Sequence, residues 1–162
     1  MGQVPIFYNH KNTGRPEGFY ESVFITKYLD SPNQPLFPFG YGLSYTTFEY
    51  SEIQMEDKQL TRDGKLNVSV KVKNTGKYKG TETVQLYIRD LVASVTRPVK
   101  ELKSFRKVEL KPGEEKKVEF VITEKDLRFW NDKKQFISEP GKFHLFIGTD
   151  SENVKKAEFV LL

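Results

Sequence analysis

Histidine and cysteine, two side chains that often carry acid–base or metal chemistry, are scarce or absent in this sequence. It contains two histidines, His10 and His144, and no cysteine. His10 stands alone in a polar stretch, and His144 lies between Phe143 and Leu145 without further ligands at metal-binding spacing. We therefore expect no catalytic, no cofactor-binding and no metal-ligating residue in this chain.

The acidic side chains do not indicate a glycosidase site of their own. A glycosidase needs two carboxylates that flank one bond in environments that perturb their pKa values. Here the acids lie beside lysines, as where Glu114 and Glu115 precede Lys116 and Lys117, and 26 basic against 22 acidic residues give a net charge of +4. Such mixing is typical of a solvated surface, so we expect no nucleic-acid partner. No apolar run is long enough to predict a membrane partner.

Two short motifs resemble functional signatures but have simpler explanations. The GYG run at Gly40–Gly42 lacks the third glycine and the strand–helix context of a dinucleotide-binding loop, so it predicts a turn. The triplet Asn67–Ser69 fits a glycosylation sequon, which an alternating strand also produces by chance.

Exposed aromatic rings are the remaining candidates for chemistry, because they can stack on sugars. Four residues are candidates: Tyr78, Tyr87, Phe129 and Trp130. The alternative is that these rings fill the core or an interface, where Tyr and Trp are common. The sequence favours this second interpretation.

From Tyr45 onward, apolar and polar residues alternate between turn signals, which is typical of half-buried antiparallel strands. About seven strands and no long helix are predicted, with a corner or short helical turn at residues 124–132. The fold class is therefore all-β, an immunoglobulin or fibronectin type III-like Greek-key β-sandwich. The predicted inward-facing residues are Leu66, Val68, Val70, Val72, Val84, Leu86, Ile88, Val118, Phe120, Ile122, Phe143, Leu145 and Ile147.

Residues 35–45 predict an extended N-terminal strap that lies on the sandwich. In an extended chain the large side chains at 37, 39, 41, 43 and 45 would share one face, and each buried one would contribute about 1.5–3 kcal/mol. Before the strap, we expect the apolar end Val4–Tyr8 to dock on a sheet edge. The polar stretch Asn9–Gly18 has little to bury and predicts weak order, and Phe19–Asp30 is ambiguous.

Four ordered runs of this sequence resemble family 3 glycoside hydrolases, the β-glucosidase family. PLFPFGYGLSYTTFEY (Pro35–Tyr50) is similar to the segment that leads into the family's C-terminal domain, and GQVPIFYNHKNTGRP (Gly2–Pro16) is similar to the end of its α/β sandwich domain. VKNTGKYKGTETVQLYIRD (Val72–Asp90) and RPVKELKSFRKVELKPGE (Arg97–Glu114) resemble the C-terminal domain's most recognisable runs. Ser104 stands where a glycine is expected.

The resemblance implies that residues 1–34 are a stub of the preceding α/β sandwich domain with a linker, and that residues 35–162 are the fibronectin type III-like domain. The parent would be a retaining β-glucosidase or related exo-glycosidase, periplasmic or secreted, whose catalytic carboxylates lie in its barrel and α/β sandwich domains. The expected function is a non-catalytic accessory domain that packs on those two domains. The alternative is a carbohydrate-binding module that presents polymeric substrate, and weak carbohydrate binding remains open.

Overall fold

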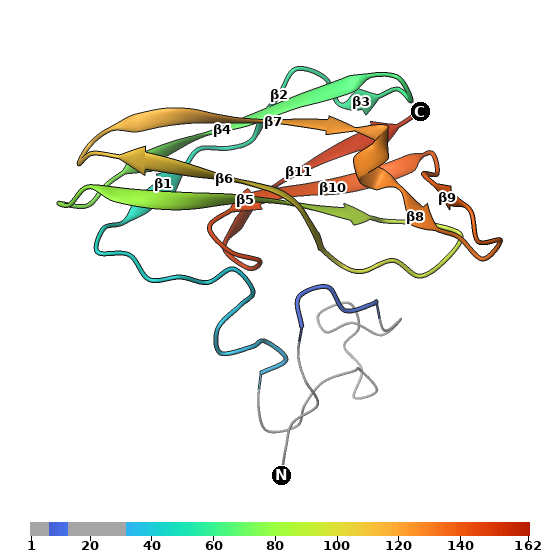
Figure 1. The fold of residues 1–162 in the computed structure, drawn as a ribbon, viewed down its shortest axis with the longest axis horizontal. Coiled ribbons are helices and arrows are strands. Elements are labelled where there is room, and N and C mark those ends of the chain that lie inside the picture. The colour runs from blue at the N-terminus through green and yellow to red at the C-terminus, as the bar shows by residue number, and fades with distance from the viewer. Residues whose placement is uncertain (1–6, 13–31) are drawn as a thin grey trace, which may run out of the picture.

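Two β-sheets packed face to face make up most of the chain (Figure 1). The computed structural model describes residues 7–12 and 32–162. Along the chain the elements are β1 (Phe48–Tyr50), β2 (Gln54–Met55), β3 (Gln59–Leu60), β4 (Lys65–Asn74), β5 (Gly80–Asp90), β6 (Glu101–Leu110), β7 (Glu115–Thr123), the 3₁₀ turn η1 (Glu124–Leu127), β8 (Phe129–Trp130), β9 (Phe136–Ile137), β10 (Gly141–Gly148) and β11 (Val154–Leu161).

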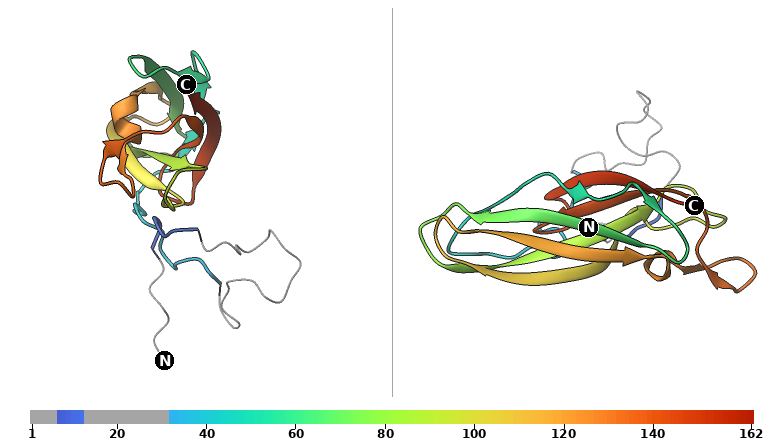
Figure 2. Two further views of the ribbon diagram at one scale, coloured as in Figure 1. Left: turned by 90° about the vertical axis from the view of Figure 1, so that its right-hand side faces the viewer. Right: turned by 90° about the horizontal axis from the view of Figure 1, so that it is seen from above.

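The first sheet is built around β4. Strand β7 pairs with β4 antiparallel from Lys65 to Lys73, so β1 and β2 both lie along the other edge of β4. The second sheet has the order β3-β11-β10-β5-β6 and is antiparallel except for the β3–β11 pair. Figure 2 shows the two sheets as separate layers when the sandwich is viewed from its end.

The core lies between these layers and follows the predicted alternation. Successive side chains of a strand point to opposite faces of its sheet, so the apolar set of each long strand faces the other sheet. All thirteen residues predicted to point inward are buried. The prediction of an all-β sandwich is therefore confirmed.

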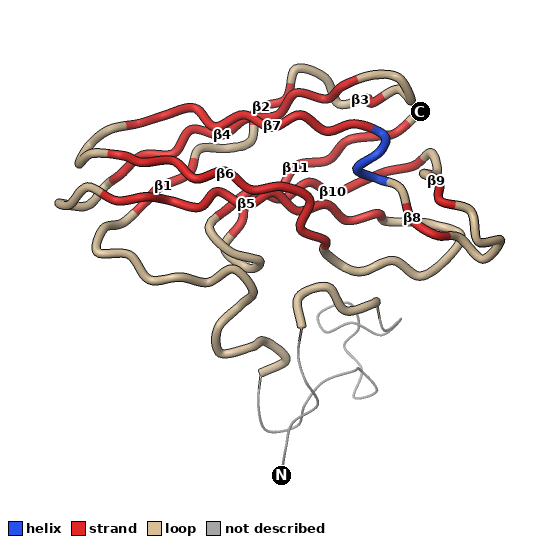
Figure 3. Tube along the Cα trace, in the orientation of Figure 1, coloured by secondary structure: helices blue, strands red, loops and turns tan. Residues whose placement is uncertain are grey.

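The strand count and the corner also follow the sequence closely. Among the described residues, seven strands have three or more residues and four further strands have two each. The predicted corner begins with η1, where the Asp126 carboxylate accepts hydrogen bonds from the Thr123 amide (2.7 Å) and hydroxyl (2.8 Å). Figure 3 marks this turn as the helical segment of the described chain. Across residues 7–12 and 32–162, the chain forms no helix with the length and apolarity that crossing a membrane requires.

Candidate interdomain interface

The outer face of the five-stranded sheet is covered along β5, where strand alternation predicted side chains that face solvent. Gln85 and Tyr87 alternate with the inward residues of β5 and were expected on the sheet's outward side. Both are nonetheless buried. Residues from outside the sandwich must therefore lie over this part of the sheet, and they come from the strap and from segment 7–12, which lie below the sheets in Figure 1.

Gln85 and Tyr87 form the polar centre of this covered face. The Tyr87 hydroxyl donates a hydrogen bond to Gln85 Oε1 (2.5 Å). Gln85 Nε2 donates to the carbonyl oxygens of Gly40 (3.1 Å) and Thr149 (2.5 Å). Burial raises the pKa of Tyr87 far above its ordinary value, so its hydroxyl stays neutral and remains a donor. One glutamine side chain thus ties the strap to the β10–β11 loop.

Gly40 lets the strap approach Gln85 this closely. Its φ of +82° lies in the left-handed region, and a Cβ there would come within 2.2 Å of Gln85 Oε1. The Tyr41 amide donates to the Pro38 carbonyl (3.0 Å), which closes a turn around this glycine. The predicted turn at Gly40–Gly42 therefore exists, and its function is to fit the strap backbone to the sheet.

A second anchor lies at the β10–β11 loop. The Ser151 amide donates to the carbonyl of Phe39 (2.9 Å), and Lys100 Nζ donates to the carbonyl of Ser151. The Lys100 ammonium also lies 4.9 Å from the centre of the Phe146 ring, and its burial lowers the pKa of this lysine. Lys100 belongs to the Arg97–Glu114 run that carried the family resemblance.

Segment 7–12 lies against the same face. The Tyr8 ring stacks on Phe39 with centroids 4.1 Å apart and meets the edge of Tyr87 at 5.9 Å. Lys11 forms a β-bridge with Pro98, and the Val99 amide donates to the His10 carbonyl (2.8 Å). The docking predicted for Val4–Tyr8 can be followed only at its last two residues, because 4–6 lie outside the described residues. The predictions for residues 13–18 and 19–30 fall outside them as well.

A hollow of about 180 Å³ remains between these pieces. Its walls come from segment 7–12, from Asn33–Pro35 at the start of the strap, from Val99–Lys100, and from Ser151–Glu152. Four chain segments far apart in the sequence therefore meet at one joint beneath the sandwich.

The strap does not bury its large side chains against the sandwich, and this part of the prediction was wrong. The strap turns at Gly40 instead of running straight, so alternate residues do not share one face. Its backbone oxygens make the contacts, whereas the rings face outward and Phe37 packs beside Tyr41 at 5.1 Å. The exposed large apolar residues here are Phe7, Leu36, Phe37, Phe39, Tyr41, Leu43 and Tyr45.

Phe39→Ala is expected to lower the free energy of unfolding by about 1 kcal/mol, because its ring is 45% exposed and stacks on Tyr8. The matched control is Tyr45→Ala, since Tyr45 is 96% exposed and is expected to change stability by less than about 0.5 kcal/mol. Urea unfolding of both variants is the measurement. Equal effects would show that the stack does not hold the strap.

The sequence-predicted sugar-stacking candidates separate into two pairs. Tyr87 and Phe129 are buried, as expected for rings that fill the core or an interface, whereas Tyr78 and Trp130 are exposed. Tyr78 lies in the β4–β5 turn and Trp130 in β8, at opposite ends of the sandwich in Figure 1, so they form no row.

Each of the two histidines lies within hydrogen-bonding distance of a polar group of the protein. His144 Nε2 and Glu158 Oε1 lie 2.9 Å apart across the β10–β11 pair, and burial lowers the pKa of this histidine. His10 Nδ1 lies 2.9 Å from the Lys11 carbonyl. Among the described residues, no three His, Cys, Asp or Glu side chains come together as a metal site would require.

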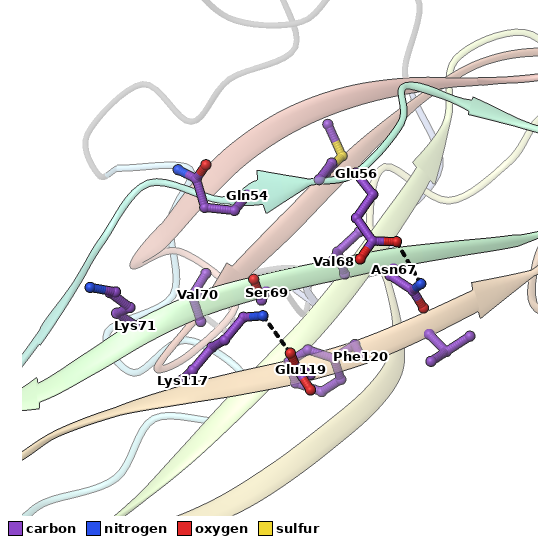
Figure 4. A pocket seen from close by; sticks show the side chains of 12 residues that line it. Gln54, Glu56, Asn67, Val68, Ser69, Val70, Lys71, Lys117, Glu119 and Phe120 are labelled. Atoms are coloured by element: carbon purple, nitrogen blue, oxygen red, sulfur yellow. Dashed lines mark hydrogen bonds and ion pairs between the residues drawn. The ribbon is translucent and has the colours of Figure 1, made fainter.

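A surface groove on the first sheet also lacks a paired-carboxylate arrangement. Figure 4 shows this groove, about 520 Å³, over β2, β4 and β7. Its acids are engaged individually, with Lys117 paired to Glu119 (2.5 Å) and Asn67 Nδ2 donating to Glu56 (2.7 Å). These are exposed pairs on a solvated sheet face.

Comparisons with known proteins agree with this architecture. Residues 82–151 match the family of fibronectin type III-like domains. Over its whole length the chain is 49% identical to a periplasmic β-glucosidase of Salmonella typhimurium, covering 21% of that protein. It is 43% identical, over 99% of its length, to thermostable β-glucosidase B of Acetivibrio thermocellus, covering 22% of that protein.

A solved structure shares the same fold. The β-glucosidase from Listeria innocua in complex with gluconolactone superposes with a TM-score of 0.90 at 42% identity, covering 98% of this chain and 22% of that one. The chain thus spans about a fifth of the length of the relatives it matches.

Proposed function

We propose that this chain, which belongs to the fibronectin type III-like domains of family 3 glycoside hydrolases, is a non-catalytic accessory domain. In this proposal it packs on the barrel and α/β sandwich domains of a β-glucosidase-like parent and stabilises them. The parent would remove terminal β-linked sugars from glycosides. The observation that carries the proposal is an exposed aromatic strap with a firmly held backbone.

The strap has the properties of a preformed docking surface. Its backbone is fixed by Gln85 and Ser151, while the rings of Phe37, Phe39 and Tyr41 remain 64%, 45% and 44% exposed. Contiguous exposed apolar patches on soluble domains mark interaction sites, and aromatic residues are enriched in the buried cores of such interfaces. A fixed backbone also means that little conformational entropy is lost when a partner covers the rings.

The relatives support the proposal that the partner is another domain of the same parent chain. Because the aligned segment is about a fifth of each relative, most of each relative lies in other domains. We propose that residues 1–34 complete the α/β sandwich domain and that residues 35–162 form the accessory domain. The joint between segment 7–12 and the strap would then be where the two domains meet. The periplasmic relative supports a periplasmic or secreted parent.

A chimeric enzyme tests this proposal. The matching segment of the Salmonella typhimurium enzyme is replaced by this chain, once unchanged and once with Phe37→Ser and Tyr41→Ser together. The unchanged chimera is expected to hydrolyse an aryl β-glucoside. The double variant is expected to lose activity at a lower temperature with a nearly unchanged KM, because the lost contacts hold domains together and do not touch substrate.

Two controls make this experiment decisive. Tyr78→Ser removes an equally exposed ring that is not part of the strap and is expected to leave the inactivation temperature unchanged. The chain alone is expected to hydrolyse no aryl β-glucoside, since both carboxylates of the retaining mechanism would lie in other domains. Equal inactivation of the strap and Tyr78 variants would contradict the interface. Turnover by the chain alone, abolished by mutating one of its acids, would contradict the non-catalytic role.

A further inference from the structure

We propose that Trp130 and Phe136 form a stacking platform for one or two sugar rings of a β-linked gluco-oligosaccharide. The platform lies on the β8–β9 hairpin at one end of the sandwich, away from the strap (Figure 1). The choice of β-linked glucose rests on the proposed function, whereas the site itself rests on the geometry of the hairpin.

The two rings occupy one face of the hairpin. Trp130 is the register partner of Phe136, and Phe129 is that of Ile137. Because side chains alternate along each strand, Phe129 points into the domain and is buried, while Trp130 and Phe136 point outward at 66% and 49% exposure. Their ring centroids lie 5.3 Å apart with planes at 41°, so they make a shallow, slightly folded surface.

The hairpin turn is held in one conformation by Asn131. Its side-chain oxygen accepts hydrogen bonds from the backbone amides of Lys133 (3.0 Å) and Gln135 (2.9 Å). The backbone amide of Asn131 donates to the Gln135 backbone carbonyl (3.1 Å). Lys134 has a φ of 57°, in the left-handed region that such a tight turn requires. The rings are therefore presented before any ligand arrives, which lowers the entropy lost on binding.

The base of the hairpin is anchored to the sandwich. The Arg97 guanidinium lies 4.4 Å from the centre of the Phe129 ring, the buried neighbour of Trp130 on β8. On either side of the hairpin, Arg128 and Ser138 both donate to the Glu124 carboxylate. Both entry and exit strands are thus fixed.

The platform offers the two features by which a pyranose ring is recognised. A β-linked glucose has an apolar face of C–H groups and an edge of hydroxyl groups. The indole and phenyl rings match the apolar face of the sugar. The hydroxyl edge of the sugar would meet a polar turn, in which Asp132, Lys133 and Gln135 are all exposed. Aromatic bodies with a hydrogen-bonding rim are the usual lining of small-molecule sites.

The size of the platform favours a small ligand over a protein. A stable protein interface buries roughly 800 Å² on each partner, and two rings ringed by charged residues supply only a small part of that. The strap, with its six exposed large apolar residues, is the surface that suits a domain. A sugar ring needs no more area than one indole face presents.

The single tryptophan of the sequence makes the test direct, because all tryptophan fluorescence of this chain comes from Trp130. Titration with cellohexaose and with laminarihexaose is expected to give a saturable change in that fluorescence and protection of Trp130 from acrylamide quenching. Phe136→Ala keeps the reporter and is expected to weaken binding about tenfold, the effect of losing one ring contact. Trp130→Ala, followed by calorimetry, is expected to abolish binding.

Tyr78→Ala is the matched control, since this exposed ring lies at the other end of the sandwich and its loss is expected to leave binding unchanged. Melting curves of all variants show that the fold is intact. No saturable change at millimolar oligosaccharide, or equal affinity in the Phe136 and Tyr78 variants, overturns the proposal. So does a lower inactivation temperature of the chimeric enzyme with Trp130→Ala, which would assign the hairpin to domain contacts. None of these outcomes bears on the strap variants that test the accessory function.

Discussion

Asn74→Ala is expected to lower the free energy of unfolding of this chain by about 3–4 kcal/mol. The Asn74 side chain is fully buried at the end of β4 and makes four hydrogen bonds. Its oxygen accepts from the Thr46 hydroxyl (2.6 Å) and the Gly76 amide (3.0 Å), and its nitrogen donates to the carbonyls of Tyr78 (2.8 Å) and Leu110 (3.0 Å).

The large effect follows from where these partners lie. They belong to the end of the strap, the β4–β5 turn and the end of β6, so one side chain joins both sheets and the strap. Alanine leaves several buried donors and acceptors without partners, and each such group costs about 1–3 kcal/mol unless water reaches it.

Urea unfolding measures this effect, and Asn67→Ala is the matched control. Asn67 lies on the same strand, but its side chain is exposed and donates only to Glu56. The control is expected to change stability by less than about 0.5 kcal/mol. A loss below about 1 kcal/mol in the Asn74 variant would show that water replaces the asparagine, and that the network does not hold the strap.

Glu124→Gln is expected to lower the free energy of unfolding by about 2–3 kcal/mol at neutral pH. The carboxylate is buried and accepts two hydrogen bonds from Arg128 Nε (3.0 and 2.9 Å) and one from the Ser138 hydroxyl (2.6 Å). Glutamine removes the charge and one acceptor. The exposed part of Arg128 can reach water, which keeps the loss below that of a fully buried ion pair.

The same carboxyl gives a pH dependence of known sign. Hydrogen bonds from Arg128 and then Ser138 hold the pKa of Glu124 below its ordinary 4.5. A pKa that is lower in the folded state than in the unfolded state stabilises the fold at pH values above the unfolded-state pKa. This contribution disappears as the pH falls through the folded-state pKa. The stability gap between the wild-type chain and Glu124→Gln is therefore expected to narrow as the pH drops below about 4.5.

Denaturant unfolding at several pH values checks both parts. Glu119→Gln is the control, because Glu119 pairs with Lys117 on the exposed face of β7 and contributes little. A gap that stays constant down to acid pH would contradict the role of the charged carboxylate. A gap no larger than that of the control would contradict the anchoring of the hairpin base.

The strands and their inward faces could be predicted from the sequence because they depend on local geometry. A strand alternates its side chains with a period of two, so Leu66, Val68 and Val70 must share one face wherever β4 lies. The same rule placed Phe143 and Leu145 in the core. Turn-forming residues then indicated where these strands end, whereas the order of the strands in each sheet came only from the structure.

The interface residues could not be predicted in the same way. Gln85 and Tyr87 lie on the outward side of β5, and strand alternation alone predicts that this side is exposed to solvent. Their burial depends on Gly40 and Tyr8, which are 45 or more positions away in the sequence. The strap was expected to run straight, and the left-handed turn at Gly40 redirected its rings to solvent.

The aromatic candidates show where local and tertiary information divide. The sequence identified Phe129 and Trp130 as residues that could stack on a sugar, but it predicted a corner or short helical turn there. The structure instead forms the short strand β8, in which the two side chains face opposite ways. The sequence did not say which of them would be buried. That was decided when Arg97 packed over Phe129 and Phe136 paired with Trp130 across the hairpin. The sequence by itself determines which side chains share a face, because backbone geometry is local, whereas only the tertiary structure decides which face is covered, because the covering residues arrive from distant parts of the chain.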